Sequence, residues 1–524
     1  MSAARDRTPA ELPIVLDRAA EAPLPAQLAA ALREAIDGGA LRPGEPVPAT
    51  RALAARLAVA RGVVVTAYEQ LTAEGYLAAG QGLGTRVHPE LATGRPGDAS
   101  AAGASRPAGS ARSTVCGAPR PPTAGASGSP ASGAAAAPPS GQLPAPLTPG
   151  IPDTTAVDTP AWRAAWRSAA ARAHLEAPDL GDPRLRAEIA EHLRRMRGTA
   201  RPVEDVIVTA GTREGLGLLL SALGGSGGGS GRGRLLVVGV EDPGYPSLRR
   251  VAARHDAEIV ALPVDAAGLD TSALPEGLLD VVIVTPSHQY PLGGSLPLAR
   301  RRQLLDWAER TGVVIVEDDY DSELRHTGTP LPALVALDDP VNGSVVLLGT
   351  FSKTVSQALS AGFLLAPARL RALIEPVRRD LGGPVPAVVQ AALAEYLGSG
   401  ELRRHTARMR RRYAARRELV VERLYGLPGV SVRPMSGGLH AVVQFSPSGG
   451  AAAGAAGAAH LEDAAEAERR VVAACDAAGL GAVALSGYWQ RRDPTDGLHG
   501  LVIGTGGPHG GEEAFDRALA ELRA

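Results

Sequence analysis

The sequence predicts an α/β protein in which a small winged helix-turn-helix precedes a large domain built on a mostly parallel, doubly wound sheet with a small α+β C-terminal subdomain. Three observations support this prediction. Helical patterns and two short strand patterns occur before residue 88, a tract of Ala, Gly, Ser and Pro follows, and short apolar runs then alternate with helical stretches. Such alternation is typical of parallel sheets covered by helices.

Composition limits the classes of protein that need to be considered. Hydrophobic residues make up 45% and charged residues 21% of the 524 residues, which is ordinary for a globular chain. No run of about 18 apolar residues occurs, so no membrane span is expected. The net charge of -1 argues against a generally cationic nucleic-acid coat, so any DNA contact has to come from a local patch. Two cysteines support neither a disulfide framework nor a metal site, and we expect a cytoplasmic protein without bound metal.

The first part of the chain has the pattern of three helices and a β-wing. Apolar residues recur at helical spacing over 25–36, 50–57 and 62–74, and Thr50 is the expected N-cap of the second helix. Residues 75–87 resemble two short strands joined by a glycine turn. Together these elements predict a winged helix-turn-helix.

Arginines in this region suggest DNA binding. Arg51, Arg56 and Arg61 lie within eleven residues that contain no acid, and Arg61 stands at the entry to the third helix. The N-terminal residues of a recognition helix contact base edges, where arginine pairs well with guanine. Arg86 in the wing would suit a phosphate or the minor groove. Residues 1–88 nevertheless contain nine arginines and nine acids, so affinity would depend on dimerisation and two half-sites.

This segment resembles the GntR family of bacterial regulators over residues 24–87. The matching stretches are 41–48 (LRPGEPVP), 51–57 (RALAARL) and 67–77 (AYEQLTAEGYL). The resemblance implies that Arg51 and Arg61 contact DNA, and Thr66 in the third helix and Arg86 in the wing complete the predicted DNA-binding set. At Ala60 and Gly62 relatives usually have a hydroxyl or amide side chain, which leaves the operator sequence open.

Composition also predicts the domain boundaries. Residues 89–150 are so rich in Ala, Gly, Ser and Pro that they cannot bury enough apolar surface to offset their ordering entropy, so we predict a flexible linker there. The predicted domains are a DNA-binding domain at 1–88 and a large domain at 151–524, whose small subdomain begins near residue 400. Residues 224–233 and 446–459 are predicted to be surface insertions.

Beyond the linker, seven apolar runs are predicted to be buried strands. They are short, rich in β-branched residues and without alternation, at 205–209, 235–240, 259–262, 281–284, 313–316, 345–348 and 362–365. Weaker strand patterns near Val430, Leu439, Ala482 and Leu501 belong to the smaller unit.

The chain contains one lysine, Lys353, among 54 basic residues. An amine can lose its proton and attack a carbonyl, which a guanidinium cannot do. Lys353 follows one predicted strand and the acids 317–319 follow another, so both emerge where open α/β sheets bind ligands. A lysine with an acid that faces a pyridine nitrogen is the pairing that pyridoxal 5′-phosphate requires. The hydroxyls of Thr350 and Ser352 and the backbone amides around Gly211 and Thr212 would receive its phosphate.

Five ordered motifs resemble fold-type I aminotransferases and, more narrowly, the aminotransferase-like domain of MocR regulators. They are 180–183 (LGDP), 241–246 (EDPGYP), 285–293 (TPSHQYPLG), 317–323 (EDDYDSE) and 349–354 (GTFSKT). The resemblance implies that Lys353 holds the cofactor as an internal aldimine and that Asp318 pairs with the pyridinium nitrogen. It also implies that Tyr320 hydrogen-bonds the ring hydroxyl and that Tyr245 stacks on the ring. Core packing is the alternative role for both tyrosines, and His288 is expected to be a structural hydrogen-bonding residue.

Three departures from the family pattern concern arginines. Relatives usually have an arginine seven residues after the lysine, where this chain has Ser360. An arginine expected on a late strand falls near Val502, and one found in some MocR proteins is replaced by Ser247. A carboxylate in a closed pocket needs charge-assisted partners. These departures weaken the case for turnover of an ordinary α-amino acid.

The resulting expectation is a homodimeric, PLP-dependent transcriptional regulator that senses PLP or a small amine at Lys353 and binds double-stranded DNA with two half-sites. A regulator of vitamin B6 synthesis is the preferred subtype, with at most a residual transaminase half-reaction. One alternative is an active aminotransferase fused to a DNA-binding domain. The other is a winged-helix repressor whose large domain has lost its cofactor and serves only for dimerisation.

Overall fold

The computed structural model describes residues 14, 16, 24–37, 41, 44–73, 76–80, 84–87, 144–173, 178–225, 235–325, 332–446, 457–490, 498–507 and 511–523. The chain divides into two compact units, Met1–Gly133 and Ala134–Ala524. The predicted linker up to residue 143 and most of the two predicted insertions lie outside the described residues.

The first unit contains the predicted helices and wing. Its elements are α1 (Leu24–Asp37), α2 (Thr50–Arg56), α3 (Arg61–Ala73), β1 (Leu77–Gly80) and β2 (Gly84–Val87), and β1 pairs antiparallel with β2. Leu28, Leu53 and Leu71, one from each helix, are completely buried and form the centre of its core. The prediction that Thr50 caps α2 was wrong. Ala49 occupies the N-cap position and Thr50 is the first helical residue, because the extended backbone after Pro48 continues through Ala49.

The second unit is built on an eight-stranded sheet with the order β3-β10-β9-β8-β7-β4-β5-β6. The strands are β3 (Val206–Thr209), β4 (Val237–Asp242), β5 (Glu258–Asp265), β6 (Gly268–Leu269), β7 (Val281–Val284), β8 (Val314–Asp319), β9 (Val345–Thr350) and β10 (Gly362–Leu365). The five strands β9, β8, β7, β4 and β5 are parallel. Strand β10 runs antiparallel to both of its neighbours, β3 and β9, and the edge strand β6 runs antiparallel to β5. The mostly parallel sheet agrees with the prediction.

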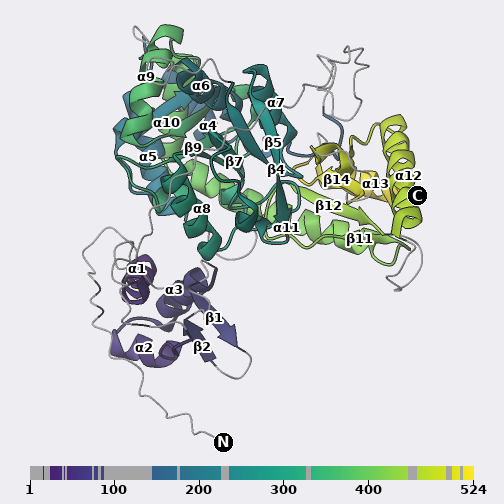
Figure 1. Ribbon diagram of the computed structural model, residues 1–524, viewed down its shortest axis with the longest axis horizontal. Helices are drawn as coiled ribbons and strands as arrows, with labels where there is room; N and C mark the ends of the chain where they lie inside the picture. The colour runs from purple at the N-terminus through teal and green to yellow at the C-terminus, as the bar shows by residue number, and fades with distance from the viewer. Residues whose placement is uncertain are drawn as a thin grey trace, which may run out of the picture. The chain divides into compact units, whose positions relative to one another are not determined.

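Helices cover both faces of this sheet (Figure 1). Side chains of α5 (Pro183–Arg197), α8 (Leu298–Thr311) and α10 (Ala387–Gly398) belong to one core cluster, and α4 (Pro160–Ala170) packs against α10. Side chains of α6 (Thr212–Gly225), α7 (Pro246–Arg254) and α9 (Ala368–Leu381) belong to a second cluster. Strands such as β3, β4, β7 and β10 are therefore buried on both faces, which explains why their apolar runs do not alternate.

The small subdomain follows the long helix α11 (Glu401–Leu424). Its antiparallel sheet has the order β11-β12-β14-β13, with β11 (Val430–Val432), β12 (His440–Phe445), β13 (Val483–Ala484) and β14 (Gly500–Gly504). The helices α12 (Gly457–Ala477) and α13 (Gly511–Arg523) complete the subdomain. No helix in the described part of the chain is both long and apolar enough to cross a bilayer.

Residues 144–153, which we call the strap, pack on the small subdomain. The Leu147 side chain is fully buried, its N–H donates to the Leu480 carbonyl at 2.8 Å, and its carbonyl accepts from the Gly504 N–H at 2.7 Å. A side chain on Gly504 would collide with the backbone of Thr148. Residues 144–150 were predicted to belong to the linker, but they are an ordered part of the large domain because the glycines of β14 let the strap lie directly against the sheet.

Candidate cofactor site

A cavity of about 300 Å³ lies at the carboxyl ends of the central strands. All eight residues predicted to bind the cofactor line it, and they are Gly211, Thr212, Tyr245, Asp318, Tyr320, Thr350, Ser352 and Lys353. They lie at the carboxyl ends of β8 and β9 or in the segments that follow β3, β4, β8 and β9, so the sheet topology brings together residues that are far apart in sequence.

Lys353 reaches the strap across this cavity. Its Nζ donates to the Gly150 carbonyl at 2.8 Å, and the Gln357 Nε2 donates to the same oxygen at 3.1 Å. Gly150 has a φ of +75°, and a Cβ at this position would lie 2.9 Å from the lysine nitrogen. The positive φ favours glycine at this position, and a side chain here would also displace the end of the lysine from the Gly150 carbonyl.

Asp318 is separated from its acidic neighbours by the alternation of strand β8. Its side chain faces the cavity, whereas those of Glu317 and Asp319 point to the opposite side of the strand and pair with Arg197 at 3.9 and 3.1 Å. Asp318 is 3% exposed, and its Oδ1 has no hydrogen-bond partner among the described residues. Burial, reinforced by Asp319, raises the pKa of Asp318 to about 8. An unpartnered buried carboxyl at a cavity wall is suited to a ligand that donates an N–H.

Aromatic rings form another wall of the cavity. Tyr290 contacts Tyr245 edge to face at 5.4 Å between ring centroids, and Tyr320 at 5.5 Å. The Tyr320 hydroxyl donates to the His288 carbonyl at 3.0 Å and lies 3.0 Å from His288 Nδ1, which is itself 2.9 Å from the Asp321 carboxylate. The rings of Tyr245 and Tyr320 pack together through Tyr290 and also border the cavity. Their stacking and hydrogen-bonding roles toward a cofactor stay predictions.

The N-terminal end of α6 borders the cavity through Gly211 and Thr212. Gly211, with a φ of +106°, turns the chain from β3 into the helix, and the Thr350 hydroxyl lies close to it. The Thr350 Oγ1 accepts the Ser352 N–H at 3.1 Å, which fixes the turn after β9. Free backbone amides at a helix N-terminus and nearby hydroxyls form a favourable environment for a phosphate.

Two further buried groups near the cavity have shifted pKa values. His440 is 1% exposed and its Nε2 lies 2.9 Å from the Pro291 carbonyl. Burial and the neighbouring His288 hold the pKa of His440 well below its usual value, so this ring is neutral. Burial raises the pKa of Glu241 to about 7, although Thr285 and Gln289 hydrogen-bond to its carboxylate.

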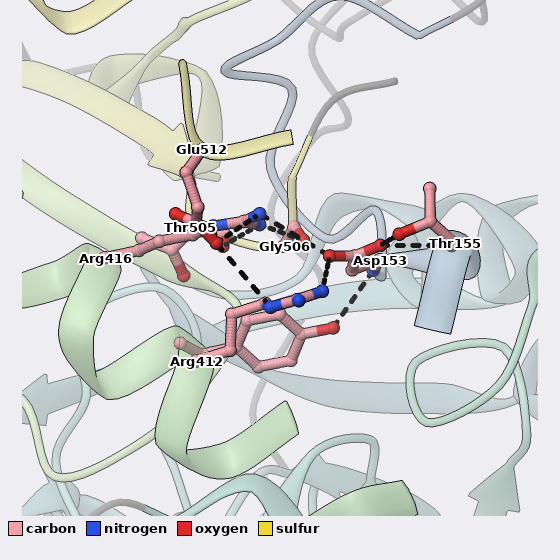
Figure 2. Close-up of polar contacts among 8 residues, drawn as sticks. Asp153, Thr155, Arg412, Arg416, Thr505, Gly506 and Glu512 are labelled. Carbon is pink, nitrogen blue, oxygen red and sulfur yellow. Dashed lines mark hydrogen bonds and ion pairs between the residues drawn. The ribbon is translucent and has the colours of Figure 1, made fainter. Parts of the chain in front are cut away.

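The end of the strap is anchored by a charged cluster around Asp153 (Figure 2). The buried carboxylate of Asp153 accepts from Arg412 Nη1 at 2.6 Å and lies 3.5 Å from Arg416 Nη2. Arg416 is 2% exposed and also donates to the Gly506 carbonyl at 2.6 Å, and it pairs with Glu512 at 3.1 Å. Burial alone would raise the pKa of Asp153, but hydrogen bonds from Thr155 and Arg412 hold it below its usual value. The cluster thus joins the strap to α11, the end of β14 and the start of α13.

Several residues that line the cavity were missed by the sequence analysis. They include Gly150, Arg213, Tyr290, Gln357 and His440. Tyr290 lies inside a quoted motif and Arg213 adjoins Thr212, so both could have been found from neighbouring signals. Gly150 was hidden by the composition of the predicted linker.

The three positions at which relatives have an arginine, and this chain does not, differ in their surroundings. Ser360 lines the cavity and has a φ of +43°. Ser247 is buried in α7, and Val502 is fully buried in β14. None of the three supplies a cation.

Among the predicted DNA-binding residues, Arg51 and Arg61 are exposed at the starts of α2 and α3. The Nη1 of Arg86 donates to the Gly44 carbonyl at 3.3 Å, so one nitrogen of the wing arginine already has a hydrogen-bond partner within the domain. Thr66 lies in α3, and its side chain is outside the described residues. Their contacts with DNA stay predictions.

Comparison with known proteins identifies relatives of both units. Residues 147–473 match the family model for aminotransferase class I and II, and residues 24–87 match that for bacterial regulatory proteins of the gntR family. A relative from Corynebacterium glutamicum, the "HTH-type pyridoxine biosynthesis transcriptional regulator PdxR", is 39% identical over 98% of both chains. The "Probable rhizopine catabolism regulatory protein MocR" of Rhizobium meliloti is 34% identical over 78% of both chains.

Solved structures similar to the chain include aminotransferases. An archaeal alanine:glyoxylate aminotransferase superimposes with a TM-score of 0.61 at 21% identity, covering 73% of this chain and 90% of that structure. The kynurenine aminotransferase of Pyrococcus horikoshii gives a TM-score of 0.58 at 21% identity, covering 72% and 89%. At this level of identity the likeness establishes the fold of the large unit.

Proposed function

This chain belongs to the aminotransferase class I and II family and to the gntR family of bacterial regulators, and from this membership we propose that it is a transcriptional regulator that binds pyridoxal 5′-phosphate in its large domain. The aminotransferase class I and II family is PLP-dependent, and the gntR-type winged helix implies DNA binding. The observation that supports the proposal best is a single cavity that contains both the only lysine of the chain and the unpartnered carboxyl of Asp318.

The chemistry of the cavity fits this cofactor. When bound, PLP supplies an aldehyde that condenses with a primary amine and a pyridine ring that withdraws electrons. Lys353 would supply the amine, and Asp318 would hold the ring nitrogen in its protonated form. Tyr245 would cover the ring, Tyr320 would hydrogen-bond its hydroxyl, and Thr350, Ser352 and the amides of Gly211 and Thr212 would bind the phosphate.

The scarcity of positively charged side chains in the cavity favours a regulator over a working enzyme. An α-amino acid substrate brings a carboxylate that needs a charged partner in a closed pocket. Serines stand at positions 360 and 247 and a valine at 502, and Arg213 is the only arginine among the described residues that line the cavity. PLP itself, or a small amine without a carboxylate, is therefore the preferred signal.

The name of the Corynebacterium glutamicum relative supports a more specific proposal. That protein is called a regulator of pyridoxine biosynthesis and shares 39% identity over almost the whole chain. We propose that this chain also controls vitamin B6 synthesis in response to PLP. A homodimer that presents two winged helices would bind two half-sites, as expected for a neutral DNA-binding domain.

Footprinting on the DNA upstream of the protein's own coding region, with and without PLP, tests the regulator. We expect PLP to change the protected positions or the protein concentration needed for protection. Identical footprints would refute the proposal. Incubation with amino donors and keto acids tests the enzyme alternative, which multiple turnovers would favour.

A spectroscopic experiment tests the role of Lys353. Bound PLP should give visible absorbance in the wild-type protein, and this absorbance should be lost in Lys353→Ala. Lys353→Arg is the matched control, because it keeps the positive charge but cannot condense with an aldehyde, and it should also stay colourless. Colour that persists in either variant would contradict the assignment of Lys353.

A further inference from the structure

Resting on the proposed function, we propose that Arg213 selects the phosphorylated form of the ligand by pairing with its phosphate at the N-terminal end of α6. The proposal concerns specificity between pyridoxal 5′-phosphate and pyridoxal, which differ in this phosphate alone. Arg213 is not among the residues that the sequence predicted to bind the cofactor.

The position of Arg213 links it to the phosphate-binding side of the cavity. It is the second residue of α6, and it lines the cavity together with Gly211, Thr212, Thr350 and Ser352. The amides of the first helical turn have no intrahelical acceptors, and the helix dipole favours an anion at this end. A guanidinium beside these amides adds a full positive charge with several donors in a planar fork.

Arg213 is free to bind a ligand because its acidic neighbour is already paired. The Glu214 carboxylate accepts from Arg378 Nη2 at 2.5 Å and from the Ala210 N–H at 3.1 Å. Arg213 is exposed, and it forms no ion pair or hydrogen bond with another residue in the described ranges. The side chain can therefore turn to a phosphate without breaking an existing contact.

The other polar groups of the cavity cannot replace this charge. Lys353 is the group that would condense with the aldehyde, and it donates to the Gly150 carbonyl. His440 is neutral because burial and His288 hold its pKa well below its usual value. Ser360 is also in the lining but has only a hydroxyl. Arg213 is thus the one fixed cation that the described lining offers besides the reactive lysine.

An independent feature indicates that a ligand with a basic ring occupies this cavity. The Asp318 carboxyl is 3% exposed, borders the cavity, and leaves Oδ1 without a partner in the described part of the chain. A buried carboxyl without a partner is costly unless a bound group satisfies it. The cavity therefore combines an acid for a ring N–H with a cation for a phosphate.

The test compares dissociation constants for pyridoxal 5′-phosphate and for pyridoxal, measured by absorbance titration of the full-length protein. In Arg213→Gln we expect PLP to bind about 10- to 100-fold more weakly, the range for loss of a charged hydrogen bond. Binding of pyridoxal should stay within about twofold, because pyridoxal has no phosphate to lose. Arg213→Lys should fall between the wild type and Arg213→Gln, because it keeps the charge but not the fork.

Arg254→Gln is the matched control, because it removes an exposed arginine of α7 that does not line the cavity. It should leave both dissociation constants unchanged. Equal weakening of both ligands in Arg213→Gln, or no weakening of either, would refute phosphate selection. A wild-type protein that binds neither ligand would instead refute the proposed function, so the two failures can be distinguished.

Discussion

The position of Asp318 in strand β8 determines that its side chain, and not those of the neighbouring acids, faces the cavity. Three consecutive acids end β8, and alternation sends Asp318 to the cavity and its two neighbours to Arg197. The pKa of Asp318 is raised to about 8, by burial first and by Asp319 second, although the charge of Lys353 acts in the opposite direction. The groups that act on it also include Lys353, Asp321 and Glu241.

The raised pKa of Asp318 predicts a pH dependence of stability in the ligand-free protein. The folded state holds a proton at Asp318 that the unfolded chain releases near pH 3.8, so folding stability should decrease as the pH rises from about 4 to about 8. In Asp318→Asn this contribution should vanish. Thermal unfolding of both proteins at pH 5.5 and pH 8 measures it. The variant should gain stability relative to the wild type at the higher pH, and a difference that does not change with pH would contradict the prediction.

Gly150→Ala should affect both stability and cofactor binding. An alanine at a φ of +75° costs about 1 kcal/mol, and its Cβ would lie 2.9 Å from Lys353 Nζ. We expect weaker PLP binding in addition to the lower melting temperature. Gly198→Ala is the control, because Gly198 has a φ of +62° but nothing within 4 Å of the added Cβ. If both variants bind PLP equally well, the contact between Gly150 and Lys353 does not matter for binding.

At the scale of elements, the strap depends on the cluster around Asp153. Asp153→Ala would leave Arg416 buried with less compensation, so we expect a loss of about 3 kcal/mol in the stability of the large domain. Asp158→Ala is the control, because it removes an exposed ion pair with Arg163 and should cost less than about 1 kcal/mol. Denaturant titrations compare the two. Equal losses would show that the cluster does not anchor the strap.

The elements of the large sheet could be predicted because each strand is a short β-branched run between polar turns, as 281–284 and 345–350 illustrate. Parallel pairing then explains why Lys353 and Asp318 meet. Strand alternation alone does not indicate which of the acids 317–319 faces the cavity, and that choice came from the family resemblance. The role of Gly150 could not be predicted, because the strap that contains it is held by hydrogen bonds of Leu147 to Leu480 and Gly504, which are distant in sequence.

At the scale of the whole molecule, the balance of nine arginines and nine acids in residues 1–88 makes a single DNA-binding domain a weak binder. A dimer that binds two linked half-sites would compensate. We therefore expect that scrambling one half-site of the target lowers the affinity by about 10-fold or more in a gel-shift titration. Scrambling an equal length of flanking DNA is the control. Affinity that survives the loss of one half-site would contradict dimeric recognition.

The strap also determines where the large domain can be separated from the rest of the chain. Pro149 and Gly150 form part of the cavity wall, and Leu147 fills the core of the small subdomain. A truncated protein for ligand screening that began at Ile151 would lack this wall and expose the groove left by Leu147. An isolated domain has to start upstream of Pro144 if its binding properties are to represent those of the intact regulator.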